Sequence, residues 1–213
     1  MHQTGLRSIV GKKYRHTTTD SSHGYAISEN ILCRDFTAQT IGHKRVGDLT
    51  YIKTAEGLLY LTIAMDLADH KIIGWAMSQT MLANETSTAA LRMAFQNRKI
   101  EKQALLFHSD RGIQYACNAF RELIKTRQIT QSMSSKGNCW DNAVAESFFK
   151  TLKTELVYQH TFANIVAAKL AIFEYIEVWY NKQRLNSAIG YRTACQMEQL
   201  LNNKKNNKIL TDF

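Results

Sequence analysis

The 213-residue sequence contains no proline, although an average usage of about 5% would give roughly ten. Because proline acts mainly by restricting the backbone, its absence affects the rigidity of loops and removes no catalytic group. The four cysteines, Cys33, Cys117, Cys139 and Cys195, form no C-x-x-C pair, which excludes a paired-cysteine zinc site and a dense disulfide framework. No apolar run approaches the ~20 residues of a membrane span, and the N-terminus lacks a signal-peptide layout. We therefore expect a cytoplasmic protein with reduced cysteines and no membrane partner.

Acidic residues are outnumbered by basic ones. The 27 Lys and Arg against 18 Asp and Glu give a net charge of +9 and a pI near 9.4. Residues 1–47 carry 7 basic and 3 acidic residues, residues 48–146 carry 11 and 10, and residues 147–213 carry 9 and 5. A nearly neutral middle between two basic flanks indicates a polyanionic partner. The alternative is that the flanks only keep the protein in solution, because net charge identifies a partner loosely.

The pattern of apolar residues predicts one α/β domain with short connections. Residues 46–54, 58–65 and 71–77 are alternating or apolar runs separated by turn residues, which predicts an antiparallel three-stranded meander. Helical spacing then alternates with short strand-like runs. We expect, in order, a helix from an Asn84 N-cap to about Asn97, a strand at 105–109, a helix at 118–127, a strand at 129–133, and helices at 140–157 and 164–181.

Composition divides the chain into three regions. Residues 1–44 are polar and rich in Thr, Ser and His, and we expect them to form a basic lead-in. Residues 45–160 contain the predicted α/β core. Residues 161–213 are expected to form a C-terminal helix followed by a polar, basic tail that includes the Asn- and Lys-rich residues 202–208.

Three carboxylates occupy positions that suit a metal site. Asp48 lies inside the first predicted strand, Asp110 follows the fourth strand directly, and Glu146 lies early in the helix that begins near residue 140. Singly, each is more commonly a cap, a turn former or a surface charge. Together they form an all-oxygen set that suits Mg²⁺ or Mn²⁺, and two such ions could clamp a phosphodiester displacement. Asp66 and Asp69 compete with Asp48, but they fall at a predicted turn, so we rank Asp48 first.

The helix that carries Glu146 has one polar face. Steps of 100° bring Asn142, Glu146, Lys150 and Lys153 onto this face. The plainer interpretation is an exposed stripe with a Glu146–Lys150 pair, worth only ~0.2–0.5 kcal/mol. The functional interpretation is that Asn142, Lys150 and Lys153 contact DNA phosphates beside a metal ligand.

Two loops add further candidates for DNA binding. Arg111 follows Asp110 and precedes a flexible glycine, so it supplies a cation at the same edge of the sheet. Lys136 lies in a Ser- and Gly-containing loop that also carries Trp140. Trp140 could stack on a base, although a core position is an equally good interpretation.

Several segments resemble the integrase core of bacterial insertion-sequence DDE transposases of the second-reading-frame (OrfB) type, which are related to retroviral integrases. The longest is SMSSKGNCWDNAVAESFFKTLK at residues 132–153. The others that carry the resemblance are Gly47–Ile52, Phe107–Gly112 with Gln114 and Tyr115, Glu174–Asn181 and Asn186–Tyr191. The similarity runs from about Ile31 to about Glu198.

This resemblance implies a ribonuclease-H-like fold, in which a mixed sheet of a three-stranded antiparallel meander plus two further strands is flanked by helices. It puts the acidic triad of the family on Asp48, Asp110 and Glu146, and a basic residue on Lys153. The family uses metal ions to nick a transposon end and then joins the freed 3′-hydroxyl to target DNA, without a covalent enzyme intermediate. Its members act as multimers on paired DNA ends, so we expect a homo-oligomer on DNA.

The resemblance also bears on the N-terminal lead-in. Gly5–Ile9 looks like the trailing end of a DNA-binding region that precedes the core. Recognition of transposon ends is then expected from a first-reading-frame DNA-binding protein or from a fused N-terminal region. The expected place of action is the bacterial cytoplasm, at nucleoid DNA.

The sequence departs from the family pattern at a few positions. Arg45 replaces a Trp, and Phe107 and Asn186 each replace a His. Phe107 thereby removes a polar group beside Asp110, from which we expect weaker positioning of DNA. Two other functions are compatible with the same residues: a ribonuclease-H-like nuclease that only hydrolyses, and a catalytically inactive DNA-binding fragment.

Overall fold

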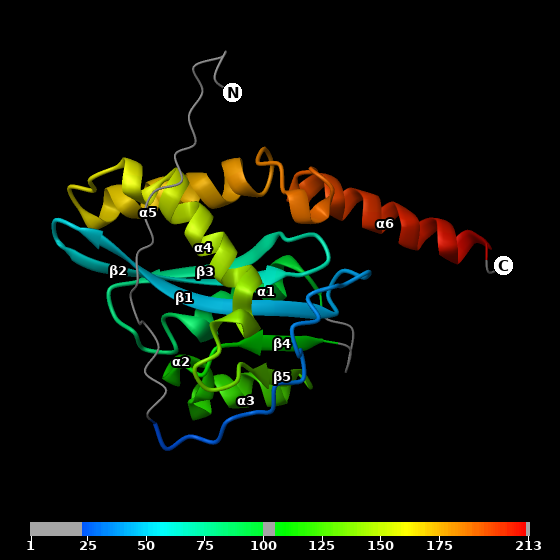
Figure 1. Cartoon of the computed structure of the whole chain (residues 1–213), viewed down its shortest axis with the longest axis horizontal. Helices are drawn as coiled ribbons and strands as arrows, with labels where there is room; N and C mark the ends of the chain where they lie inside the picture. Colours follow the sequence, from blue (N-terminus) through cyan, green and yellow to red (C-terminus); the bar gives the residue numbers. More distant parts are fainter. Residues whose placement is uncertain (1–22, 100–104, 212–213) are drawn as a thin grey trace, which may run out of the picture.

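The computed structural model describes residues 23–99 and 105–211, and within them five strands form one mixed sheet (Figure 1). The strand order is β3-β2-β1-β4-β5. The first three strands pair antiparallel, whereas β4 pairs parallel with both β1 and β5. The strands are β1 Lys44–Thr54, β2 Gly57–Asp66, β3 Ile72–Ser78, β4 Leu106–Ser109 and β5 Thr130–Met133. The predicted meander with two further strands is therefore confirmed.

Helices cover both faces of this sheet (Figure 1). The helices are α1 Ser87–Asn97, α2 Ile113–Ala116, α3 Asn118–Thr126, α4 Ala143–Glu155, α5 Ile165–Glu174 and α6 Ala194–Thr211. Shorter turns lie between them: 3-10 turns η2 Cys139–Asn142, η3 Val157–Gln159 and η5 Ser187–Ile189, and the π-helical turn η4 Tyr175–Tyr180. Within residues 23–99 and 105–211, no helix combines the length and apolarity needed to cross a membrane.

Two hydrophobic cores fill the space between the layers. One joins the even-numbered face of β1 to α4, α5 and η4, where the Phe148 ring packs edge-on against Tyr180 at 4.7 Å. The other joins the opposite face of the sheet to α1, α2 and α3, where Phe107 packs against Phe120. Gly74 lets α1 lie directly on β3, because a Cβ at this position would be 2.1 Å from the Ala90 carbonyl oxygen.

Three details of the predicted secondary structure are wrong. The first helix after the meander has Thr86 at its N-cap position, two residues after the expected Asn84, and begins at Ser87. The predicted helix 164–181 is capped by Asn164, whose side chain accepts from the Ala167 N–H, but it changes to a π-helical turn for its second part. Residues 202–208 belong to α6 and are not an irregular tail. Lysine is a good helix former and no Gly or Pro interrupts this segment, so α6 continues through it.

A buried ion network attaches the start of α6 to the sheet. The Arg98 guanidinium lies 2.8 Å from an Asp66 carboxylate oxygen, 2.7 Å from Asp69 and 2.6 Å from Glu198 of α6. Asp66 and Asp69 are fully buried, and so is Arg45 beside them. The remainder of α6 extends away from the sheet (Figure 1). Asp66 and Asp69 thus belong to a structural cluster, separate from the carboxylates predicted to bind metal.

Of the predicted lead-in 1–44, residues 1–22 lie outside the described part of the chain. Residues 23–43 have no regular helix or strand before β1 begins at Lys44. They are attached to the core by Leu32, which is 2% exposed, and whose N–H donates to the hydroxyl of Ser132 in β5. The part described here is therefore packed against the sheet.

Candidate active site

The register between β1 and β4 brings Asp48 and Asp110 together. The paired residues include Arg45 with Phe107 and Val46 with His108, an offset of 62 residues. The same offset puts Asp48 beside Asp110 at the point where β4 ends. Residues in register on parallel neighbours point to the same face, and here it is the face covered by α4.

Glu146 reaches this edge from the first turn of α4. The helix is attached to β1 at its start, because the Asn142 side-chain N–H donates to the Gly47 carbonyl oxygen at 3.1 Å. Gly47 precedes Asp48, so this hydrogen bond fixes the start of α4 next to the first aspartate. The loop after β4 is fixed as well, since the Gly112 N–H donates to an Asp110 carboxylate oxygen at 2.9 Å.

The three carboxylates share one electrostatic environment. Burial raises the pKa of Asp48 well above its usual range, and the charges of Asp110 and Glu146 raise it further. A hydrogen bond from the Leu49 N–H and the charge of Lys153 act in the opposite direction. The pKa of Glu146 is raised by partial desolvation and then by Asp110. Mutual repulsion of this kind is what a divalent cation relieves.

The charge of Lys153 acts on Asp48 from the last turn of α4. Burial lowers the pKa of its ammonium, and the charge of Asp48 raises it again. The Nζ atom also lies 5.5 Å from the centre of the Tyr51 ring, a cation–π contact. Lys153 therefore contacts β1 at Tyr51 and lies within electrostatic range of Asp48.

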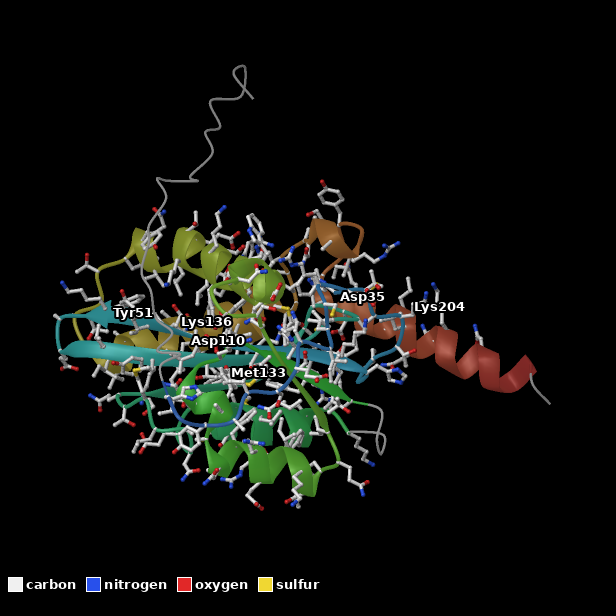
Figure 2. The ribbon with its side chains drawn as sticks, turned by 60° about the horizontal axis from the view of Figure 1, so that its bottom comes forward. Asp35, Tyr51, Asp110, Met133, Lys136 and Lys204 are labelled. Carbon is white, nitrogen blue, oxygen red and sulfur yellow. The ribbon has the colours of Figure 1, made fainter. Side chains whose placement is uncertain are left out.

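The other predicted DNA-binding cations lie on α4 and on the loops that follow β4 and β5. Lys136 and Lys150 are exposed, and Arg111 is partly buried. The Arg111 Nε donates to the Ser134 carbonyl oxygen at 2.6 Å, so its guanidinium also holds the loop after β5. In the view of Figure 2, Asp110 and Lys136 both lie over the middle of the molecule.

Asn142 does not fit its predicted role as a DNA contact. It is 2% exposed, and its side-chain amide is used for the hydrogen bond to β1. Its Oδ1 atom is buried without a hydrogen-bond partner among the described residues. Helix periodicity alone placed it on the polar face, but that face is covered here by β1. Trp140, by contrast, is 69% exposed, which excludes the core interpretation.

The chemistry of these donors fits a hard divalent cation. All three candidate side chains are carboxylates, which Mg²⁺ prefers as protein ligands. They lie within electrostatic range of one another. Even so, among residues 23–99 and 105–211 no three His, Cys, Asp or Glu side chains are arranged as a preformed group for one ion. A shared ion would thus need the carboxylates to move closer together.

Two buried groups near the site escaped the sequence analysis. The Tyr115 hydroxyl is fully buried and has no hydrogen-bond partner in the described part of the chain. Burial raises the pKa of Tyr115 well above its usual range, and the charges of Asp48 and Asp110 raise it further. His108 is also buried, and its ring nitrogens lie 2.8 Å from the Ser132 hydroxyl and 3.2 Å from another serine hydroxyl. Both residues belong to the segments that resemble the transposase family, but only the fold reveals that they are buried.

Asp141 fixes the loop that carries Lys136. Its carboxylate accepts hydrogen bonds from the Arg34 Nε at 2.8 Å, the Asn30 side-chain amide at 2.9 Å and the Ser135 N–H at 2.8 Å. Burial acts to raise the pKa of Asp141, but the hydrogen bonds from Arg34 and Ser135 outweigh it and lower the pKa below its usual value. The segment before β1 therefore holds the loop next to the carboxylates.

Comparison with protein families and relatives gives a consistent result. Residues 40–139 match the family described as Integrase core domain, and residues 127–193 match a second family of the same description. The chain is 37% identical over 198 residues to the transposase InsF of insertion sequence IS3A from Escherichia coli K12, which covers 93% of this chain and 68% of InsF. It is 33% identical over 199 residues to the IS904 transposase of Lactococcus lactis, covering 93% and 78%.

Solved structures share the fold at much lower identity. A chain in the structure of the simian T-cell lymphotropic virus intasome in complex with PP2A regulatory subunit B56 gamma superposes with a TM-score of 0.61 and 15% identity, covering 84% of this chain and 60% of that chain. The HTLV-2 integrase catalytic core in complex with magnesium gives 0.55 and 16%, covering 76% and 99%. The predicted ribonuclease-H-like fold is confirmed. The family matches at residues 40–193 include all three carboxylates.

Proposed function

The chain belongs to the insertion-sequence transposases that carry an integrase core domain, whose function is DNA transposition and integration, and we propose that Asp48, Asp110 and Glu146 are its catalytic carboxylates. The observation that carries this proposal is the β1–β4 register, which brings two aspartates 62 residues apart to one edge of the sheet. Glu146 joins them from α4, which is fixed to β1 by Asn142. The activity is that of a polynucleotidyl transferase.

We further propose that these carboxylates hold two Mg²⁺ ions, with Mn²⁺ as a substitute. The support is the all-carboxylate donor set and its mutual repulsion, together with the magnesium in the HTLV-2 integrase core. When bound, such ions activate water or a 3′-hydroxyl and stabilise the leaving oxygen. The protein supplies the ligands and a fixed framework for them.

The neighbouring cations bind and orient the DNA backbone in this proposal. Lys153 and Lys150 extend from α4, and Arg111 and Lys136 lie on the loops that follow β4 and β5. Contacts of this type fix the position of a duplex without reading its sequence. Asn142 acts as a positioning residue, because its amide holds α4 against β1.

The partners that we propose follow from the same function. They are the transposon ends and the target DNA, on which the chain assembles as a homo-oligomer at the bacterial nucleoid. HTLV-2 integrase cores have been solved in dimeric and trimeric forms. For residues 1–44 we retain the interpretation of a lead-in that follows a DNA-binding region. A first-reading-frame protein or a fused N-terminal region would then recognise the ends.

A strand-transfer assay tests the proposal. The purified chain is incubated with pre-cut transposon-end DNA and a supercoiled target, in Mg²⁺, in Mn²⁺ or in EDTA. We expect joined products with either ion and none in EDTA. Asp110→Asn should reduce joining by at least about a hundredfold, since metal ligation is worth several kcal/mol in the transition state. Asp35→Asn is the matched control, because Asp35 is exposed and pairs with Lys44.

The outcomes separate the alternative functions. A donor end that lacks its 3′-hydroxyl should abolish joining but leave nicking intact. Metal-dependent nicking without any joined product would indicate a nuclease that only hydrolyses. Equal nicking and joining by the wild type and Asp110→Asn would refute the catalytic assignment and leave only the function of a DNA-binding fragment.

A further inference from the structure

A groove of about 500 Å³ lies on the other side of α4 from the carboxylates. Ser147 and Thr151 of α4 form one wall, and residues 184–191, with Tyr191 at their end, form the opposite wall. Phe148 and Tyr180 are among the residues at its base. Ligand pockets of about 300–1,000 Å³ take a small molecule, so this groove has the size for one or two nucleotide units.

Helix geometry puts one wall of the groove about a quarter turn around α4 from Glu146. Each residue turns 100° along α4, so Ser147 follows Glu146 by about a quarter turn. Lys150 lies at 40° from Glu146, between the carboxylate face and the groove face, and its side chain is exposed. A DNA strand that leaves the carboxylates past Lys150 therefore enters the groove.

The loop at the far wall is held rigidly by its own hydrogen bonds. The Asn186 carbonyl oxygen accepts from the Tyr191 N–H at 2.9 Å, and its N–H donates to the Arg192 carbonyl oxygen at 3.0 Å. The Asn186 side chain accepts from the Ala188 N–H at 3.0 Å. Ile189 is buried and attaches the loop to the core. The loop is thus preorganised and needs little ordering to bind a ligand.

Tyr191 has an unusual conformation within this loop. Its φ is 54°, in the left-handed region that a bulky residue rarely adopts, and its side chain is 72% exposed. Such a conformation is energetically unfavourable and persists where the surroundings impose it, commonly at functional sites. Packing does not account for the ring, because most of it faces solvent. The loop instead holds an aromatic face at the edge of the groove.

The side chains that line the groove favour a nucleic acid strand. None of the lining residues is Asp or Glu in the described part of the chain, and hydroxyl, amide, imidazole and guanidinium groups are present. The Arg184 guanidinium is paired with Glu155 at 2.8 Å, so it does not make the groove strongly cationic. Polar walls with an aromatic ring at the edge are typical of sites that hold unpaired bases by stacking.

We propose that this groove binds an unpaired nucleotide of the DNA strand that reaches the carboxylates. Its base stacks on the Tyr191 ring, and its backbone lies along the Ser147 and Thr151 hydroxyls. The proposal rests on the proposed function, because it assumes that DNA occupies the neighbouring site. It adds a preference for DNA ends that carry a single-stranded extension.

Fluorescence anisotropy with two DNA probes tests this preference. One probe is a short blunt duplex, and the other is the same duplex with several unpaired nucleotides at one end, both measured in Ca²⁺ with the full chain. We expect the wild type to bind the extended probe at least about fivefold more tightly, since stacking on one aromatic ring is worth roughly 5- to 150-fold. Tyr191→Ala should remove this ratio and leave the affinity for the blunt probe unchanged. Tyr191→Phe should retain it.

Two further variants keep the test decisive. Ser147→Phe fills the groove from an exposed helix position, so it should remove the ratio without unfolding the protein, as circular dichroism would verify. Tyr158→Ala changes another exposed tyrosine outside the groove and should keep the ratio. An unchanged ratio in both Tyr191→Ala and Ser147→Phe would overturn the proposal. The proposal would also be overturned if these variants changed the oligomeric state of the protein but kept the ratio, since the groove would then bind another protein chain.

Failure of this proposal is distinguishable from failure of the proposed function. Asp110→Asn should lose strand transfer and keep the binding ratio, because the groove is separate from the carboxylates. If Asp110→Asn still joined DNA, the catalytic assignment would be wrong, whatever the ratio. If Asp110→Asn lost joining while the wild type bound the extended and the blunt probes equally tightly, only the groove assignment would be wrong.

Discussion

Replacing Asp48 by asparagine should stabilise the metal-free protein, although it removes a proposed catalytic carboxylate. Burial and the charge of Asp110 raise the pKa of Asp48 well above its usual range. A raised pKa in the folded state means that the ionised carboxylate is less favourable in the native than in the unfolded chain. At neutral pH, Asp48 therefore lowers the free energy of unfolding. Asparagine has a similar shape and carries no charge.

The size of this effect follows from the sheet geometry. Neighbouring strands lie ~4.8 Å apart, and two unit charges at that separation repel by about 3 kcal/mol at an effective dielectric constant of about 20. Asp48 and Asp110 are both partly exposed, so solvent and salt reduce the relief to about 1 kcal/mol. For a domain of this size that free energy corresponds to roughly 2–4 °C in Tm. We expect the Tm of Asp48→Asn in EDTA to exceed that of the wild type by about this amount.

Mg²⁺ should reverse the order of the two melting temperatures. An ion at 100 times its Kd stabilises the native state by about 2.7 kcal/mol. The wild type should gain this stabilisation, whereas Asp48→Asn lacks a proposed ligand and should gain much less. The variant that is more stable in EDTA should therefore become the less stable one in saturating Mg²⁺.

Calorimetry or thermal melting with and without Mg²⁺ measures both effects, and pH adds an independent test. The destabilisation by Asp48 is absent below its ordinary pKa of 3.8 and grows as the pH rises through the raised value. The higher Tm of Asp48→Asn should thus disappear near pH 3.8.

Asp35→Asn is the control for both tests. The hydrogen bond from Lys44 lowers the pKa of Asp35 to about 2, so removing the Asp35 carboxylate should not raise the Tm. Equal Mg²⁺ gains for wild type and Asp48→Asn would refute the metal assignment.

Three other substitutions test the framework of the site. Burial lowers the pKa of His108 to about 4, so the free energy of unfolding of the wild type should fall by about 2 kcal/mol between pH 7 and pH 5. In urea titrations, the free energy of unfolding of His108→Gln should depend less on pH. Arg98→Met removes the cation that pairs with two buried aspartates, of which only Asp66 keeps a second ion-pair partner, Arg45, among the described residues, and should cost about 3–5 kcal/mol, measured by thermal unfolding. Asn142→Ala removes a buried hydrogen bond to β1 and should cost about 1 kcal/mol, while strand transfer falls more than DNA affinity.

Matched exposed residues serve as controls for these substitutions. His160→Gln, Arg92→Met and Asn202→Ala change the same residue types on the surface and should leave stability and strand transfer near wild-type values. A pH dependence that persists in His108→Gln would assign it to another group. An Arg98→Met protein as stable as the wild type would show that the buried ion network contributes no net stability. If Asn142→Ala weakened DNA binding and strand transfer equally, its assignment to positioning would be wrong.

The central part of the fold was accessible from the sequence because its signals are local. Alternation over residues 46–54 and the apolar run 58–65 specify strands, and the first two strands of the structure extend these ranges by only one or two residues at some ends. The α6 helix was missed because Asn- and Lys-rich segments carry no amphipathic pattern. What holds the start of this helix is Glu198, which pairs with Arg98 from 100 residues away. A contact of that separation has no local signature.

The candidate site was predictable in its residue types but not in its geometry. The two aspartates could be identified from strand positions, yet their proximity depends on the β1–β4 register, which a single sequence does not specify. Asn142 illustrates the limit most clearly. The helix period puts it on the same face as Glu146 and Lys150, but the hydrogen bond to Gly47 buries it. Burial decides between a ligand contact and a structural contact, and it is a property of the packed sheet.

The same packing shows where Phe107, a departure from the family pattern, lies relative to Asp110: its ring is buried in the core and is not beside the carboxylates. Alternation along β4 points Phe107 away from the face of His108 and Asp110, into the core beneath β1. There its ring fills the space that a side chain at Gly47 would need, since a Cβ at Gly47 would lie 2.5 Å from Phe107 Cζ. The aromatic ring and the glycine are therefore one packing unit. Because that unit supports β1 from the side opposite the carboxylates, a polar residue at 107 would face the hydrophobic core and not the DNA.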